Sequence, residues 1–507
     1  MKRPRGFQQD GSNEHYLGTD HLRVDLKSRT VSSGLVTAVA QIAQLALNVG
    51  STMVLARQLM PRDFGLVAMV MTVMSFLRIF KEAGLSAATV QRQGINHAQV
   101  SNLFWANVAL SAFASVVMAV SAPLIAWFYR EPTLTRISLT LAGTFLLSGL
   151  ATQHLALLSR QMRFKALATI RVGSAGLGVL VGLGMAWAQC GYWSLVGLQV
   201  SVPLATCVLI WRVSRWRPQW VARGTEMRSL LTFGANVTSS AFIYSLARGA
   251  DSLLIGKYYG SDALGLYSRA SALLVRPVEQ FTSPMDDVFV PALSRLQAEP
   301  ERYRRTFLQA HDAIALAGFV FTGVFLPLAR PLILVVLGSQ WEHGAPIFGA
   351  LTVGALFLPL CSAASWLFAS QGRGGDWLVM GSVVSLVTVA SFVLGLPFGP
   401  AGVAVCYAVS GVLVVLPVVY HIAGRQGPVV ATDLWSSFFR HLPVCAVVFA
   451  ATAAGRILVV DFSPLAQLLI CVFLGLVVGV AFVCVFPPVR RTAVNVIRTI
   501  REIKDAA

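Results

Sequence analysis

The sequence has little charge. Asp, Glu, Lys and Arg make up 12% of its 507 residues, whereas a soluble globular protein carries about 25%. Hydrophobic residues make up 56% of the chain, and the mean hydropathy is +0.68. A soluble core cannot hide this much apolar surface. The composition therefore excludes a soluble protein and predicts that the lipid bilayer is the main solvent of the chain.

Patterns for metals, disulfides and nucleotides are also missing. The seven cysteines lie mostly in apolar stretches, and none forms a CxxC pair or lies near a histidine at ligand spacing. Neither a metal site nor a disulfide framework is therefore indicated. The glycine-rich stretch Gly372–Gly375 lacks a Walker lysine, so no ATPase site is expected. The sequence indicates no cofactor.

The first thirty residues contain no apolar segment. They do not have the pattern of a cleavable signal peptide, and we expect residues 1–30 to form a polar cytoplasmic tail. The formal net charge of +18 would suggest nucleic acid as the partner of a soluble protein. In a membrane protein, Lys and Arg gather in cytoplasmic loops instead, so no nucleic acid partner is expected.

Long apolar runs are abundant. A membrane-spanning helix needs about 20 mostly apolar residues, and about fourteen such runs follow one another between short polar or Pro/Gly-containing connections. They lie near residues 34–57, 65–90, 99–129, 134–159, 168–188, 192–211, 229–256, 262–290, 307–329, 345–369, 376–396, 400–422, 438–460 and 464–486. The predicted fold class is an all-α integral membrane protein with about 14 transmembrane helices.

The distribution of Lys and Arg predicts the orientation. With both termini in the cytoplasm, 28 of the 40 Lys and Arg residues fall in cytoplasmic segments, 7 fall outside and 5 lie within spans. This fourfold bias has the sign that membrane insertion produces. It favours an even number of spans with both termini inside.

The chain also resembles itself at an offset of about 200 to 210 residues. The stretch from Ala56 to Leu66 parallels Gly256 to Leu266, Pro123–Ile125 parallels Pro331–Ile333, and the turn at Gly191 parallels that at Gly399. Six spans per copy is an even number, so both copies face the same way, as in a parallel repeat. We expect a tail at 1–30, an N-lobe at 31–215, a C-lobe at 216–425, two added helices at 426–486 and a basic cytoplasmic tail at 487–507.

Several ordered motifs resemble one known family. They are Leu55–Met69, Glu82–Arg92, Asp251–Gly256 with Gly265–Ala270, and Pro291–Gln297. Together they resemble the polysaccharide transporter (oligosaccharide flippase) family of the multidrug/oligosaccharidyl-lipid/polysaccharide superfamily, and are most similar to the colanic-acid exporter type. The family usually has Asp-Leu where Glu82-Ala83 stands here. The resemblance covers about residues 30 to 425.

The resemblance implies a flippase of the bacterial inner membrane. Its substrate would be an undecaprenyl-pyrophosphate-linked oligosaccharide repeat unit, moved from the cytoplasmic to the periplasmic leaflet by alternating access. The pathway would be exopolysaccharide or lipopolysaccharide biosynthesis. The expected partners are this glycolipid, membrane lipids, and a polysaccharide polymerase with its export machinery.

The five basic residues within spans are the candidate substrate-binding residues, because ionisable side chains in a bilayer are costly and mark function by default. Arg provides a planar fork that matches phosphate oxygens, and a cationic cleft would replace the hydration that a pyrophosphate loses in the membrane. We rank Arg276 first because it lies near the middle of its span. The set is Arg276, Arg269, Arg248, Arg78 and Lys81.

Three carboxylates lie in the same spans, namely Asp251, Glu279 and Glu82. One hypothesis is that they couple transport to protons or sodium, because burial raises the pKa of a carboxyl group. The other is that they only neutralise arginines. Arg78 with Glu82 is an i,i+4 pair, and Arg248 with Asp251 is an i,i+3 pair, which are the spacings of neighbours on one helix face.

Other functions remain as alternatives. A drug or metabolite antiporter of the same superfamily would share the architecture, as would a lipid II flippase. A membrane polymerase or ligase is less compatible, because no nucleophile–His arrangement, paired carboxylates or metal cluster lies at a plausible outside site. We therefore expect a transporter rather than an enzyme.

Overall fold

The computed structural model describes residues 26–81, 89, 95–220 and 227–490. Within these ranges, some side chains of the helices are not described, among them those of Lys81, Arg248, Arg276 and Glu279. The described chain is helical and contains no strand. Helices suit a bilayer because each satisfies its backbone hydrogen bonds internally. The all-α prediction is therefore confirmed.

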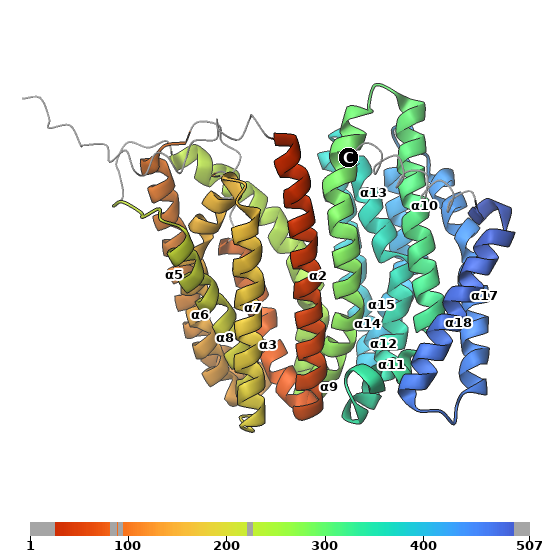
Figure 1. Ribbon diagram of the computed structural model, residues 1–507, viewed down its shortest axis with the longest axis horizontal. Coiled ribbons are helices and arrows are strands. Elements are labelled where there is room, and N and C mark those ends of the chain that lie inside the picture. The colour runs from red at the N-terminus through yellow and green to blue at the C-terminus, as the bar shows by residue number, and fades with distance from the viewer. Residues whose placement is uncertain (1–25, 82–88, 90–94, 221–226, 491–507) are drawn as a thin grey trace, which may run out of the picture. The chain divides into compact units, whose positions relative to one another are not determined.

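Two compact units divide the chain. The first comprises Met1–Leu59 and Val70–Ser245, and the second comprises Met60–Met69 and Leu246–Ala507. The first unit contains α2 (Leu26–Gln58), most of α3 (Pro61–Lys81), α5 (His97–Tyr129), α6 (Thr133–Arg160), α7 (Phe164–Trp187) and α8 (Trp193–Val213). Figure 1 shows these helices running lengthwise through the unit.

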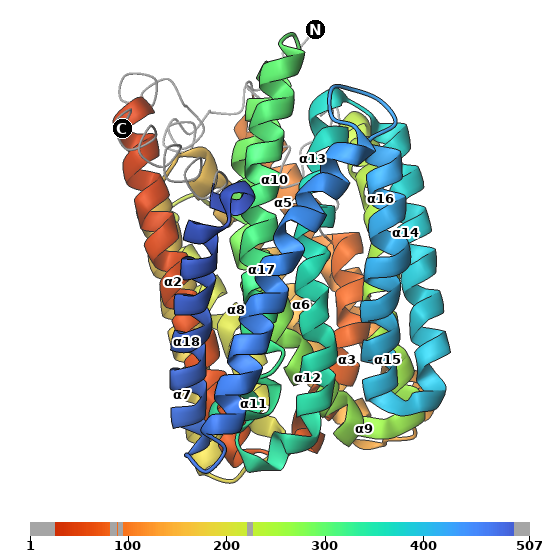
Figure 2. The same cartoon turned by 90° about the vertical axis from the view of Figure 1, so that its right-hand side faces the viewer.

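The second unit contains most of α9 (Met227–Arg295) and all later helices. They are α10 (Pro300–Phe325), α11 (Ala329–Val336), η2 (Ser339–Gly344), α12 (Ala345–Thr352), η3 (Val353–Leu356), α13 (Leu358–Gln371), α14 (Gly374–Gly395), η4 (Leu396–Phe398), α15 (Gly399–Ser410), η5 (Gly411–Val415), α16 (Leu416–Ala423), α17 (Ala431–Leu458) and α18 (Pro464–Val485). Figure 2 shows α17 beside α10 and α18, with which it packs.

Where the structure describes them, the predicted spans lie mainly in helix. Within the described residues, ten segments are long and apolar enough to cross a membrane. The helices α3 and α9 are not among these ten. The described part of α3 carries Arg62, Asp63 and Arg78, and that of α9 carries Asp251 and Arg269 among its charges. The chain is thus a multi-pass membrane protein in which two helices are more polar than the rest.

Local signals explain several helix boundaries. At the start of α5, the Asn96 side chain accepts a hydrogen bond from the Gln99 backbone N–H at 2.8 Å, and Gln99 Oε1 accepts one from the Asn96 N–H at 3.2 Å. This capping box satisfies two backbone donors that the helix leaves free. Ser463 caps α18 through a single bond, in which its hydroxyl oxygen accepts from the Ala466 N–H, and Pro464 occupies the first helical position.

The sequence repeat reappears in backbone geometry. Arg163 before α7 and Arg373 before α14 have nearly the same dihedral angles, with φ −81° and ψ 55° in the first and φ −85° and ψ 55° in the second. At the aligned turns, Gly191 has φ +55° and Gly399 has φ +79°. Glycine adopts positive φ at little cost. Aligned residues of the two sequence copies therefore have similar backbone conformations at these positions.

Small residues produce close helix packing where GxxxG spacing predicts it. A side chain at Gly178 or Gly182 would meet α8, and one at Gly475 or Gly479 would meet α17. In membranes, such residues let two backbones approach closely. The second of these contacts joins α18 to α17, so these two helices form a tight antiparallel pair.

Candidate functional site

The second unit contains a reciprocal glycine contact between Met60–Met69 and α9. A Cβ atom on Gly65 would collide with the carbonyl oxygen of Ser261, and one on Gly265 would collide with the carbonyl oxygen of Pro61. At an offset of 200 residues, Pro61 aligns with Ser261 and Gly65 aligns with Gly265. A contact that repeats when the two partners are exchanged is a local two-fold contact. The two sequence copies therefore meet symmetrically at this point.

The site continues around Phe64, which precedes this glycine. The Arg269 guanidinium carbon lies 5.1 Å from the centroid of the Phe64 ring. That ring makes an edge contact with Trp341 at 5.2 Å. Phe64 and Trp341 are only 4% and 0% exposed. A cation over an aromatic face is stabilised by roughly 0.5–2 kcal/mol, so buried aromatic groups hold Arg269 in place.

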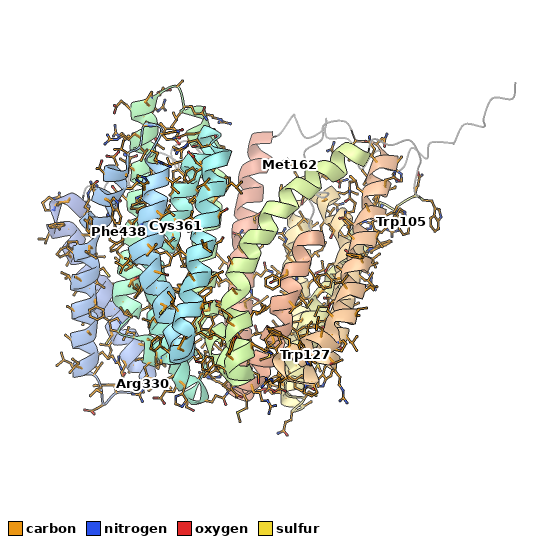
Figure 3. The ribbon with its side chains drawn as sticks, turned by 180° about the vertical axis from the view of Figure 1, so that it is seen from behind. Trp105, Trp127, Met162, Arg330, Cys361 and Phe438 are labelled. Carbon is orange, nitrogen blue, oxygen red and sulfur yellow. The ribbon has the colours of Figure 1, made fainter. Side chains whose placement is uncertain are left out.

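Trp127 and Trp341 lie near the ends of predicted spans, where tryptophan is enriched at the membrane interface. Trp127 on α5 is 74% exposed and projects from the first unit in Figure 3. Trp341 is instead fully buried, because Phe64 covers its ring. Its role is to support the site rather than to anchor the chain at the membrane surface.

Asp251 forms a hydrogen bond with a tyrosine in the other half of α9. Its carboxylate accepts a hydrogen bond from the Ser252 backbone N–H at 2.5 Å and one from the Tyr267 hydroxyl. Tyr267 is 2% exposed. The two halves of α9 are joined at Gly260, which has φ +80° and ψ −172°. The break lies where the sequence places the connection between two spans, and it brings Tyr267 to Asp251.

Spacing along α9 places Asp251 and Arg269 at comparable depth. Each residue is nine positions from Gly260, which corresponds to about 13 Å along a helix. One predicted cation and one predicted carboxylate therefore belong to the same level of the second unit. The aromatic residues Tyr267 and Phe64 accompany them.

The structure describes only some of the other predicted site residues. Arg78 is exposed on α3 within the first unit. The backbones of Lys81, Arg248, Arg276 and Glu279 lie in α3 and α9, but their side chains are outside the described residues, as is the whole of Glu82. The i,i+4 and i,i+3 pairings expected for Arg78 and Arg248 therefore stay predictions.

A second polar cluster escaped sequence reasoning. It lies between α10, α16 and α17 and comprises Tyr420, His311, Ser437, Asp312 and Arg440. The sequence signals were an adjacent His and Asp in an apolar run, and an adjacent Arg and His in another. Arg440 lies nine residues after the first residue of α17, in the N-terminal third of that helix.

Comparison with known proteins places these features in context. A family model described as "Polysaccharide biosynthesis protein" matches residues 54–346. The teichuronic acid biosynthesis protein TuaB of Bacillus subtilis is 28% identical over 59% of this chain and 62% of its own length. The succinoglycan biosynthesis transport protein ExoT of Rhizobium meliloti is 28% identical over 66% of this chain and 69% of its own. The lipopolysaccharide biosynthesis protein WzxC of Escherichia coli is 20% identical over 84% and 88%.

The chain therefore spans less than two thirds of TuaB and most of WzxC. Among solved structures, a lipid II flippase MurJ in an inward closed conformation has a TM-score of 0.70 at 13% identity, over 90% of this chain and 98% of that chain. An inward-facing multidrug resistance transporter of the MATE family has a TM-score of 0.59 at 14% identity, over 80% and 95%. At these identities the likeness concerns the fold.

Proposed function

Because this chain belongs to the polysaccharide biosynthesis protein family, we propose that it is a flippase for a lipid-linked oligosaccharide. It carries an undecaprenyl-pyrophosphate-linked repeat unit from the cytoplasmic to the periplasmic leaflet of the bacterial inner membrane. The observation that carries the proposal is the family match on a chain whose fold is that of a lipid flippase. A polymerase and the export machinery then take up the product.

The physical task of such a protein is to protect a phosphorylated headgroup. The hydrocarbon layer is about 30 Å thick, and stripping an ionised phosphate of water without compensation is prohibitively costly. Arginine side chains supply charge-assisted hydrogen bonds to phosphate oxygens. An arginine that is held in place before the substrate arrives loses less entropy when it binds.

Arg269 has the properties that this task requires. It is partly buried, lies in α9 within the predicted span 262–290 and is supported by the Phe64 ring. We assign it to the pyrophosphate together with Arg276, Arg248, Arg78 and Lys81. Asp251 keeps the site from being purely cationic, and the Tyr267 hydroxyl fixes the position of its carboxylate. With Glu279 and Glu82 it stays a candidate for ion coupling.

The proposal is tested by deleting the gene in its native host. Loss of one extracellular polysaccharide, with accumulation of its lipid-linked repeat unit in the cytoplasmic leaflet, is the expected result. Complementation with wild type should restore the polymer. Normal polymer with altered drug tolerance would favour an antiporter, and loss of viability with accumulated lipid II would favour a lipid II flippase.

A point substitution localises the function. Arg269→Gln removes the charge but keeps much of the side-chain length, and we expect it to lower polymer export at an unchanged membrane level. Arg302→Gln is a matched control, because Arg302 is an exposed arginine that pairs with Glu299 at 3.2 Å outside this site. Equal export by the two variants would remove Arg269 from the mechanism.

A further inference from the structure

A continuous hydrogen-bonded chain joins α16, α10 and α17 inside the second unit. The Tyr420 hydroxyl lies 3.1 Å from His311 Nε2, and His311 Nδ1 lies 3.0 Å from Ser437 Oγ. Ser437 Oγ donates to Asp312 Oδ1 at 2.5 Å, and Arg440 Nη1 donates to Asp312 Oδ2 at 2.9 Å. We call these five residues the polar chain.

Elementary chemistry determines the direction of each bond. The single Ser437 proton goes to the Asp312 carboxylate, because an ionised carboxylate only accepts hydrogen bonds. Ser437 therefore accepts from His311, so the imidazole proton is on Nδ1. The other ring nitrogen then accepts from the Tyr420 hydroxyl. When Asp312 is ionised, all of the donors point toward its carboxylate.

The same heavy atoms also fit the opposite direction. A proton on Asp312 lets its carboxyl group donate to Ser437, which then donates to His311 Nδ1. The imidazole proton is then on Nε2 and points to the Tyr420 oxygen. Serine, tyrosine and both histidine tautomers allow this exchange of roles. The polar chain therefore accommodates one added proton by reversing its hydrogen bonds.

Arg440 is the one member that cannot reverse, because a guanidinium has no acceptor. Protonation of Asp312 would leave this cation without its counter-charge in the N-terminal third of α17. The Arg440 side chain is 36% exposed and the Asp312 side chain is 12% exposed. The ion pair is therefore the end of the polar chain that solvent or substrate can reach, whereas His311 and Tyr420 are 0% exposed.

The surroundings contain a second acceptor. His441 Nδ1 lies 2.8 Å from the Ser437 carbonyl oxygen and must therefore carry the ring proton. Its Nε2 atom is buried and has no hydrogen-bond partner in the part of the chain that the structure describes. Among the other charged groups on these helices, Arg304 and Asp433 pair with each other at 2.6 Å. His441 Nε2 is therefore a second buried acceptor beside the polar chain.

We propose that Asp312 is a proton-binding site that couples a proton to transport, with Ser437, His311 and Tyr420 as its hydrogen-bonded support. The inference rests on the proposed flippase function. When Asp312 binds the proton, one O–H bond forms on its carboxylate, its charge changes from −1 to zero, and no covalent bond to carbon breaks. Loss of the charge weakens the Arg440 contact, which joins the N-terminal third of α17 to α10. Proton binding thereby changes how these helices are held together.

The test measures translocation by purified protein in liposomes with a fluorescent undecaprenyl-pyrophosphate oligosaccharide. For one coupled proton, a gradient of one pH unit changes the accumulation ratio by up to about tenfold. We expect this response in wild type and its loss in Asp312→Asn. Asp433→Asn is the matched control, because Asp433 also bridges α17 to α10 through Arg304 but lies outside the polar chain. It should keep the response.

Ser437→Ala provides a variant that keeps the ion pair and removes only the serine link. We expect it to retain folding and lose most of the gradient response. A gradient response of wild-type size in Asp312→Asn, or none in wild type that translocates, overturns the proton site. If wild type translocates nothing at any pH, the flippase proposal fails instead.

Proton binding is then still testable on the detergent-purified protein. Acidification should produce infrared carbonyl bands of protonated carboxylic acids, and the Asp312→Asn difference spectrum should lack the one component that belongs to Asp312. Asp433→Asn should keep that component. An identical band in wild type and Asp312→Asn overturns the assignment, whatever the transported substrate.

Discussion

Replacing Gly65 by alanine should destabilise the protein through one backbone contact. The added Cβ would come within 3.0 Å of the Gly265 backbone nitrogen and closer still to the Ser261 carbonyl. Backbone atoms cannot rotate away as a flexible side chain would, so α3 and α9 must separate. Overpacking of this kind costs about 1–3 kcal/mol, which exceeds the roughly 1 kcal/mol that alanine contributes to a helix relative to glycine.

The assay is the temperature at which half of the detergent-purified protein is lost from the monodisperse fraction. Gly50→Ala is the matched control, because a Cβ there meets nothing within 4 Å. We expect Gly50→Ala to be neutral or stabilising and Gly65→Ala to lower the transition temperature. Equal transition temperatures for the two variants would refute the reasoning.

The symmetry of the contact leads to a second prediction. Gly265→Ala should cost about as much as Gly65→Ala, because its Cβ meets the Pro61 carbonyl in the equivalent way. The double variant should cost less than the sum, since the first substitution already separates the two backbones. Contacting positions are where additivity fails. Full additivity would show that the two glycines do not share one contact.

Three further outcomes follow from other contacts. Tyr267→Phe leaves the Asp251 carboxylate without its hydroxyl donor. We therefore expect the free energy of unfolding to fall by about 1–3 kcal/mol. The exposed control Tyr258→Phe should show no such loss. Arg269→Lys keeps the charge but loses the planar group over the ring, and export should lie between wild type and Arg269→Gln. Arg373→Lys should reduce stability measurably, because this guanidinium donates to the last carbonyls of α16 at 2.8 and 2.9 Å; an unchanged transition temperature would contradict that capping role.

The spans were predictable because the signal is local. An apolar run of about 20 residues favours a membrane helix wherever it occurs, and the described parts of the predicted runs lie mainly in helix. The turn between the two halves of α9 was also predictable, since Gly260 separates two such runs. The aligned turns at Gly191 and Gly399 were also predictable, because the sequence repeat keeps a glycine at both positions and both have a positive φ.

The candidate site was predictable only as a set of charged residues. Sequence spacing identified Arg269 and Asp251 as costly groups in a bilayer, but it suggested partners on the same helix face. The structure gives Asp251 a tyrosine from across the Gly260 break and places Arg269 on Phe64. These partners are 16 residues apart in the first case and more than 200 apart in the second, beyond the reach of any helical periodicity.

Hydropathy and charge bias determined the class of this protein, because solvation of a segment depends mainly on its own side chains. They predicted an all-helical membrane chain, which the structure confirms, with polar exceptions in α3 and α9. Tertiary structure alone decided that Trp341 is buried, that Gly65 meets Gly265 and that Asp312 faces Arg440. The reason is that the environment of a buried charge, and the closeness of two backbones, depend on a second residue. Folding brings that residue from a distant part of the chain.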